Sequence, residues 1–316
     1  MAIQKVAVVG VSHHASRQIH RVQAYRSSGL GNSRHQGRPG PPQCWLDVTA
    51  ITRNESTATF PEKVAVKKVD ITSVDSVKDA IAGQHAVVSA AASAAAGNQK
   101  VIIDAVIAAK VPRFIPSEFG IPSREYRDTK IGGLLAPKIR NTDYLIELAK
   151  QHDWFSWTGV SNGLFLDWSI RSGRSFVDLK NHKGTIVDSG NEPYSTSTLG
   201  FIGQAVVAVL KKPGDTANKY LDIAGVVTTQ NEVLRIAEKV TGAKFDLSHV
   251  NGAELEKIGD EKLARHDYSA FVEYLQQFLF ADGAGHALKP EKSANELLGL
   301  KEENLEELIK SIADEL

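Results

Sequence analysis

Short apolar runs alternate with helical patterns through the first half of the chain, and this alternation constrains the fold more than any other feature. The runs predicted as strands cover residues 5–10, 47–53, 64–70, 85–91 and 113–115. Helices are predicted from Thr72, with Asp75 as its capping-box partner, and over residues 98–110. Repeated strand–helix units of this length give a parallel sheet with right-handed crossovers. We therefore predict an α/β fold with a doubly wound parallel sheet of the NAD(P)-binding Rossmann type.

The second half is less regular and is expected to form a smaller C-terminal α/β substrate domain. Helices are predicted over residues 137–151, 198–210 and 301–316, and a strand over 155–160. Another helix should begin after Thr229, with Glu232 as its capping-box partner. The last helix should turn Leu305, Leu308 and Ile312 inward. The predicted domains are residues 1–158 for the dinucleotide and 159–316 for the substrate.

Composition limits the functional classes. Basic and acidic residues number 37 each, so the chain lacks the net positive charge that favours nucleic-acid binding. A single cysteine and the absence of a signal peptide suit a cytoplasmic location. No stretch reaches the ~18 apolar residues of a membrane span, and no zinc-type motif is present. We expect a monomer or homodimer that binds a small molecule and neither metal, membrane nor nucleic acid.

One segment, residues 11–46, departs from the alternating pattern. It holds five arginines and four of the ten histidines, but no lysine, aspartate or glutamate. Residues 29–42 are rich in glycine and proline and lack an apolar period, which is typical of a loop. A solvated loop, a nucleic-acid-binding arm and an out-of-frame or intron-derived translation all account for this composition. The regular strand pattern resumes at Asp47.

Two positions suit a dinucleotide. Gly10 follows the first predicted strand, where a glycine turn can approach a pyrophosphate closely, and we expect Gly10 and Ser12 to contact the cofactor. The later glycines of such a turn are missing: His13 and Ser16 stand in the corresponding places. Arg53 ends the second predicted strand, where a guanidinium suits the 2′-phosphate of NADP. An exposed loop arginine is the alternative interpretation of Arg53.

Three motifs carry a family resemblance. Residues 98–120 read NQKVIIDAVIAAKVPRFIPSEFG, residues 52–56 read TRNES, and residues 161–165 read SNGLF. Together they resemble the NmrA-like, isoflavone-reductase-like branch of the NADP-dependent reductases, and its fungal members most. The resemblance covers the first strand and residues 47–168, extends more loosely to the C-terminus, and fails over residues 11–46, where the family has a GxxGxxG turn and its helix.

The resemblance implies a reaction and a set of site residues. The expected reaction is NADPH-dependent reduction of a small aromatic or carbonyl/enone-like compound. Alignment of the helix after PSEFG makes Lys138 the general acid/base, which requires that burial or a positive neighbour lower its pKa. A surface lysine is the alternative. The remaining cofactor-site residues that the resemblance implies are Ser89, Ala90, Ser117, Phe119 and Asn162.

Two further motifs in the sequence point to other enzyme classes. Tyr126 and Lys130 match the YxxxK pair of short-chain dehydrogenases, but Gly132 and Gly133 follow, so we predict a loop with Tyr126 at most on the substrate side. Residues 159–163 match the GxSxG element of hydrolases without a telling histidine. A dinucleotide-binding regulator without turnover, and a cofactor-defective paralogue, remain alternatives to the reductase.

Overall fold

A computed structural model describes residues 2–10, 46–62, 64–91 and 99–316. It divides into two units whose segments alternate along the chain. The first unit takes residues 1–117, 140–159 and 203–220, and the second takes 118–139, 160–202 and 221–316. Ser12 and most of the segment 11–46 lie outside the described residues. The division predicted from the sequence, with one boundary after residue 158, stays a prediction. The two units differ from it in that their segments alternate along the chain.

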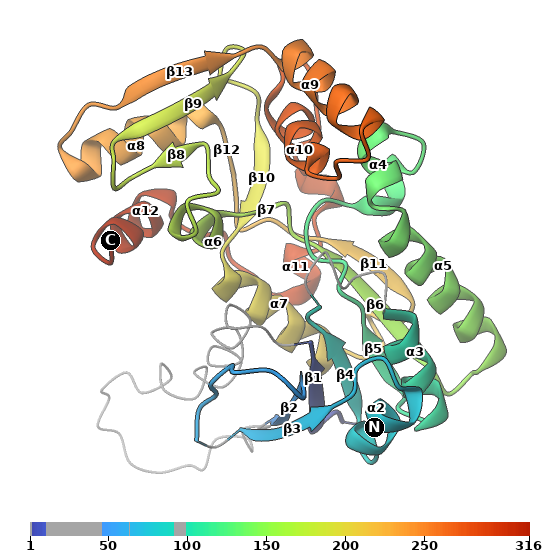
Figure 1. Cartoon of the computed structure of the whole chain (residues 1–316). Helices are drawn as coiled ribbons and strands as arrows, with labels where there is room; N and C mark the ends of the chain where they lie inside the picture. Colours follow the sequence, from blue (N-terminus) through green and yellow to red (C-terminus); the bar gives the residue numbers. More distant parts are fainter. Residues whose placement is uncertain (1, 11–45, 63, 92–98) are drawn as a thin grey trace, which may run out of the picture. The chain divides into compact units, whose positions relative to one another are not determined.

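Within the described residues, seven strands form the central sheet in the order β3-β2-β1-β4-β5-β6-β11 (Figure 1). Their bounds are β1 Lys5–Val9, β2 Asp47–Arg53, β3 Ala65–Val69, β4 Ala86–Ser89, β5 Arg113–Ile115, β6 Ser156–Ser161 and β11 Lys219–Asp222. The pairs from β3 to β6 are parallel, with Val8 opposite both Ala50 and Val88. This order is the one expected of a doubly wound sheet and confirms the predicted fold class. The sequence did not predict β11.

The helices of the first half follow from apolar spacing and local caps. α2 (Val74–Ile81) buries Val77 and Ile81, and α3 (Gln99–Ala108) buries half of its ten residues. The cap of α2 was predicted one residue too early: Ser73 Oγ accepts from Ser76 N, while Thr72 Oγ1 donates to Asp70 at 2.6 Å. α5 (Ala136–Gln151) carries proline in its first turn, as predicted.

Arg113, the first residue of β5, has a fully buried side chain in the first unit. Its guanidinium donates to Ser156 Oγ at 3.0 Å, to Thr216 Oγ1 at 2.6 Å and to Thr158 Oγ1. Burial lowers the pKa of Arg113 to about 10. These hydroxyls therefore fasten β5 to β6 and to the segment after α7 (Leu199–Lys211).

Two small sheets and several helices build the second unit. One sheet has the order β12-β10-β7 and the other the order β13-β9-β8. The strands are β7 Leu164–Phe165, β8 Val177–Asp178, β9 Lys183–Val187, β10 Tyr194–Ser197, β12 Val226–Thr228 and β13 Asp246–Val250. The helices are α4 Lys130–Leu134, α6 Leu166–Arg171, α8 Gln230–Thr241, α9 Gly252–Ala264, α10 Ala270–Phe280, α11 Asn295–Leu298 and α12 Leu305–Ala313, with short 3-10 turns at η2 Ser123–Tyr126 and η3 Pro290–Lys292.

The predicted caps of this half are partly confirmed. Thr229 Oγ1 accepts from Glu232 N, but the Glu232 carboxylate accepts from Thr228 Oγ1 and completes no capping box. α12 begins at Leu305 and not at residue 301, and its buried residues are Leu305, Ile309 and Ile312. Leu308 is partly buried and packs against the same core, so the predicted inward face is confirmed and Ile309 adds to it.

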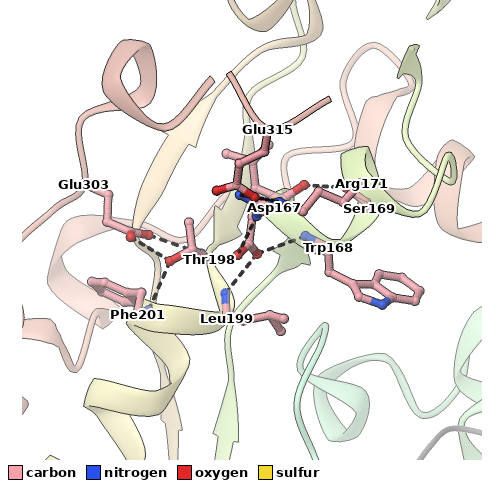
Figure 2. Close-up of polar contacts among 10 residues, drawn as sticks. Asp167, Trp168, Ser169, Arg171, Thr198, Leu199, Phe201, Glu303 and Glu315 are labelled. Atoms are coloured by element: carbon pink, nitrogen blue, oxygen red, sulfur yellow. Dashed lines mark hydrogen bonds and ion pairs between the residues drawn. The ribbon is translucent and has the colours of Figure 1, made fainter. Parts of the chain in front are cut away.

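Two carboxylates from distant parts of the chain meet the first turn of α7 (Figure 2). Leu199 N donates to Asp167 at 3.0 Å, and Thr198 donates to Glu303 through its N–H at 3.1 Å and its hydroxyl at 2.6 Å. Arg171 bridges Asp167 and Glu315, at 3.4 and 2.9 Å. Negative groups are favoured here because the first N–H groups of a helix lack helical partners. These contacts hold the C-terminal segment to the start of α7.

Candidate active site

Gly10 ends β1 in a backbone conformation that only glycine adopts readily. Its φ is +85°, and its N–H donates to Ile51 O at 3.1 Å. A Cβ at this position would lie 3.0 Å from Ala91 Cα and 3.1 Å from Ala91 N. The structure therefore requires glycine where the sequence analysis placed the first turn of a dinucleotide site.

The carboxyl ends of β4 and β5 bring further predicted residues together in the first unit. Ser89 is fully buried, and its Oγ has no partner among the described residues. Ala90 N donates to Val9 O at 2.8 Å. Ser117 Oγ donates to Ala91 O at 2.8 Å, and Ser117 N donates to Gln99 Oε1 at 2.7 Å. Ser117 thus ties the two strand ends, while Ser89 Oγ is buried without a hydrogen-bond partner.

Arg53 lies at the exposed end of β2, and it makes no ion pair with another described residue. The exposed position satisfies both interpretations of this arginine, as a ligand for a 2′-phosphate and as a solvated side chain. Together with the Gly10 cradle and the unpartnered Ser89 hydroxyl, it makes the described part of this unit fit an NADP nucleotide at the carboxyl edge of the sheet.

Lys138 is a buried lysine in the second unit, with 8% of its surface exposed. It lies in the first turn of α5, and its Nζ donates to Phe119 O at 2.8 Å. Burial lowers the pKa of Lys138, and the nearby carboxylate of Glu118 opposes that shift. The structure thus excludes a surface lysine, which was the alternative interpretation of this position.

Glu118 is a second buried charged group of this site, and the sequence analysis assigned it no role although it belongs to the PSEFG motif. It is 0% exposed and accepts from Ser123 Oγ at 2.8 Å. The signal that the sequence contained was an acidic residue inside the PSEFG motif, which precedes the helix of Lys138. The two buried groups are electrostatically coupled, because the Glu118 carboxylate raises the pKa of Lys138 that burial lowers.

Asn162 fixes the strand end beside Lys138. Its Oδ1 accepts from Gly120 N at 3.0 Å, its own N–H donates to Gly120 O at 2.9 Å, and its Nδ2 donates to Gly163 O. A Cβ on Gly120 would lie 3.9 Å from Lys138 Nζ. Asn162 is fully buried, so its amide serves to hold the Phe119–Gly120 backbone in place. That Asn162 lines the cofactor pocket stays a prediction.

Neither the YxxxK pair nor the GxSxG match brings together the side chains that its enzyme class requires. The segment around Tyr126 and Lys130 was predicted as a loop, which is wrong: η2 and α4 cover it, and α4 includes both glycines. Gly132 fits because a Cβ there would lie 1.8 Å from Tyr126 O. Lys130 pairs with Glu256 at 2.8 Å and Asp260 at 2.7 Å, which raises its pKa, so it does not serve Tyr126.

The serine of the GxSxG match, Ser161, is the last residue of β6. Its Oγ donates to Asp222 Oδ1, and no histidine among the described residues accepts from it. A hydrolase nucleophile needs a base such as histidine in that place. The hydrolase interpretation therefore loses its support.

Over the described ranges, no group of three or more histidine, cysteine, aspartate or glutamate side chains could hold a metal ion. In the part of the chain that the structure describes, no helix is both long and apolar enough to cross a bilayer.

Known proteins resemble this chain in sequence and in structure. "Oxidoreductase aprR" of Aspergillus flavus is 34% identical over 268 residues, which cover 84% of this chain and 89% of that protein. A solved structure described as "AtPrR2 with NADP+ and (+)pinoresinol" has a TM-score of 0.72 at 17% identity and covers 99% of both chains. The structure of an isoflavone reductase has a TM-score of 0.69 at 20% identity, over 98% of this chain and 99% of that one.

The family model begins at the far end of the atypical segment. It matches residues 45–307, a span that contains Arg53, the PSEFG motif, Lys138 and Asn162. Both the family match and the Aspergillus flavus relative agree with the resemblance found in the sequence. The chain belongs to the NmrA-like family.

Proposed function

We propose that this protein is an NADP-dependent reductase of a small aromatic or carbonyl/enone-like compound, with Lys138 as its general acid. The observation that carries the proposal is the buried Lys138 ammonium, which donates to Phe119 O at 2.8 Å and whose pKa is lowered by burial. The names of the relatives support the class: the Aspergillus flavus protein is an oxidoreductase, and the pinoresinol complex contains NADP+.

Residues at the ends of β1, β2, β4 and β5 would hold the cofactor. Gly10 would lie under the pyrophosphate, Ser89 and Ala90 would lie beside the nicotinamide ribose, and Arg53 would bind the 2′-phosphate. Ser117 and Phe119 follow β5 on the nicotinamide side. When bound, NADPH supplies a hydride to the substrate.

A hydride accepted by a carbonyl or enone leaves negative charge that a proton must neutralise. Lys138 Nζ holds such a proton, and desolvation makes the ammonium a stronger acid than a lysine in water. Glu118 opposes this effect and keeps the lysine from losing its proton too early. The Phe119 carbonyl accepts from Nζ and so fixes its position. Reprotonation from solvent restores the ammonium for the next turnover.

Two lysine variants test this assignment. NADPH oxidation would be followed at 340 nm with a panel of quinones, enones and aromatic aldehydes. Lys138→Met should lower the turnover by ~10²- to 10⁴-fold, as expected for loss of a positioned general acid, with NADPH affinity within a few-fold. Lys130→Met is the matched control, because its exposed ion pairs are worth only ~0.2–1 kcal/mol each. Loss of turnover in the Lys130 variant with activity retained in the Lys138 variant would overturn the proposal.

The choice of nucleotide tests Arg53. A charge-assisted hydrogen bond is worth ~1.5–3 kcal/mol, so NADPH should bind about 10- to 150-fold more tightly than NADH. Arg53→Ala should remove this preference without weakening NADH binding. Equal binding of the two nucleotides by the parent chain would eliminate the role.

A second candidate, a cofactor-defective paralogue, is favoured by the family match, which begins only at residue 45. His13 and Ser16 stand where the family has glycine. A residue with a Cβ forced into a left-handed conformation costs ~1–2 kcal/mol. Calorimetry would compare NADPH binding by this chain and by a variant whose residues 11–46 are replaced by a family-like glycine turn and helix. Micromolar binding by the variant alone supports the second candidate, and tight binding by both supports the reductase. A cytoplasmic location and a monomeric or homodimeric state remain predictions.

A further inference from the structure

Ser197, the last residue of β10, carries a buried hydroxyl group that the proposed mechanism does not use. Its side chain is 1% exposed, and its Oγ donates to Asn162 O at 2.9 Å. The same oxygen accepts from Gly225 N at 3.0 Å. The hydroxyl thus acts as donor and acceptor at once, and it joins the end of β10 to the turn between β6 and β7.

Gly163 brings this turn close to β10 at a second point. Its φ is +67°, and a Cβ there would lie 2.1 Å from Ser195 O. Glycine is therefore required where the backbone of the turn approaches the strand. β10 also pairs with β7, which follows the turn, in a short parallel ladder. Backbone packing and the Ser197 hydroxyl together hold the turn against β10.

The other side of the same turn holds the backbone that Lys138 contacts. Asn162 N and Gly163 N both donate to Gly120 O, at 2.9 and 3.1 Å, and Gly120 N donates to Asn162 Oδ1 at 3.0 Å. Gly120 follows Phe119, whose carbonyl accepts from Lys138 Nζ at 2.8 Å. The turn thus lies between β10 and the segment that carries the hydrogen-bond acceptor of Lys138.

The Phe119 carbonyl affects the charge of Lys138 as well as its position. Burial lowers the pKa of Lys138, and Glu118 raises it. The hydrogen bond to Phe119 O favours the ammonium form, so displacement of this carbonyl should lower the pKa of Lys138 further. The titratable groups on neighbouring segments act on one another or on α9 instead: Glu125 and Tyr126 of η2, Lys130 of α4 and Asp222 of β11.

We propose that Ser197 is a positioning residue for the proton donor Lys138. Its hydroxyl holds the turn at residues 162–163 against β10, and the turn keeps the Phe119 carbonyl within hydrogen-bond distance of Nζ. Ser197 has this role in catalysis only if Lys138 has the one proposed above, so the inference rests on the proposed function. A purely structural role of Ser197, as one of the buried hydroxyls that stabilise β10, is the competing explanation.

A matched pair of variants separates the two explanations. Thr196 is also buried, and its Oγ1 donates to Leu164 O at 2.8 Å, so Thr196→Val removes a similar hydrogen bond between the same two strands. Titration of the Lys138 Cε signal by carbon-13 NMR, on the full chain labelled at lysine, measures the protonation of Nζ, and Lys138→Met identifies the signal by its loss. In Ser197→Ala the midpoint should move down by up to about 1 pH unit, the size expected for one hydrogen bond to a charged group. In Thr196→Val it should stay at the value of the parent chain.

Ser197→Ala leaves Gly225 N a second acceptor, Thr196 O at 3.0 Å, so the variant should fold. Ser197→Cys keeps the side-chain volume with a weaker donor, and its midpoint should move less than that of Ser197→Ala. The fall of turnover with pH should move together with the NMR midpoint. Full turnover in Lys138→Met would contradict the proposed function, while the NMR midpoints would still show whether Ser197 positions the lysine. An unmoved midpoint in Ser197→Ala, or an equal shift in Thr196→Val, would overturn the positioning role.

Discussion

Replacing Gly10 by alanine tests the close approach of the Ala91 backbone to the end of β1. Gly10 has φ +85°, and its Cβ would meet the Ala91 backbone at 3.0 Å. Gly83 is the matched control, since its φ is +75° and a Cβ there meets nothing within 4 Å. The two substitutions share the backbone penalty, and only Gly10 adds a steric one.

The expected sizes follow from these two terms. A non-glycine residue in the left-handed region costs ~1–2 kcal/mol, of which the more restricted unfolded chain adds back ~0.4–1 kcal/mol. Contact with the Ala91 backbone adds ~1–3 kcal/mol, the range for overpacking, because backbone atoms cannot turn away as a side-chain end can. Gly10→Ala should therefore be less stable than Gly83→Ala by about 1–3 kcal/mol.

Thermal unfolding by circular dichroism measures this difference. An unfolding entropy of ~2.1 cal/mol/K per residue converts 1 kcal/mol to about 1.5 °C for a chain of this length that unfolds in one transition. Gly10→Ala should therefore melt about 1.5–4.5 °C below Gly83→Ala. It should also lose NADPH affinity, which Gly83→Ala should keep. Equal melting temperatures for the two variants would refute the claim that Ala91 closes the space beside Gly10.

Three other outcomes are expected. Gly132→Ala should destabilise the chain strongly, because its Cβ would lie 1.8 Å from Tyr126 O. Gly133→Ala should be neutral or stabilising by up to ~1 kcal/mol, because a Cβ there would have no atom within 4 Å. Urea denaturation measures the stability of both variants, and an equal loss of stability in the two would contradict this prediction. Turnover should fall as the pH rises through the lowered pKa of Lys138. Glu118→Gln should move that fall to lower pH, because it removes the negative charge that raises this pKa. An unchanged pH–rate profile in Glu118→Gln would contradict the electrostatic effect of Glu118 on Lys138. The same lowering means that the unfolded chain binds the extra proton, so the contribution of Lys138 to stability should increase with pH between its folded and unfolded pKa values. Thr198→Ala should cost ~0.5–2 kcal/mol of stability, because Thr198 Oγ1 accepts from Phe201 N and caps α7. Thr72→Ala should change stability by under ~0.5 kcal/mol, because the Thr72 hydroxyl bonds only the exposed Asp70. Equal changes of stability in urea denaturation would disprove the capping role of Thr198.

Periodicity predicted the sheet because it depends on local residues. The runs at residues 5–10, 47–53 and 85–91 are apolar and β-branched enough to be buried strands, and the structure has β1, β2 and β4 there. The loop predicted around Lys130 was wrong for the opposite reason. Glycine disfavours helices, but the close approach of Tyr126 O to Gly132 makes glycine the residue that fits. Tertiary contacts overrode local propensity.

The site divides in the same way. Lys138 could be reached only through the family resemblance, because the first turn of a helix carries no signal of burial. Asp222 gave no signal at all: its partner Ser161 is 61 residues away, on a strand that became adjacent only through the sheet order. A hydrogen bond between residues so far apart in the sequence leaves no pattern of spacing from which it could be predicted.

The interleaving of the two units has a consequence for how this chain is made and how it can be divided. The first unit needs residues 203–220, so its sheet stays unfinished until two thirds of the polypeptide has been synthesised. By then the ribosome has already released residues 118–139 and 160–202, which belong to the second unit and await the residues up to 316. Neither unit can fold to completion as a separate N-terminal domain in the manner of tandem domains. A single crossover between two genes of this family therefore cannot exchange one complete unit for another.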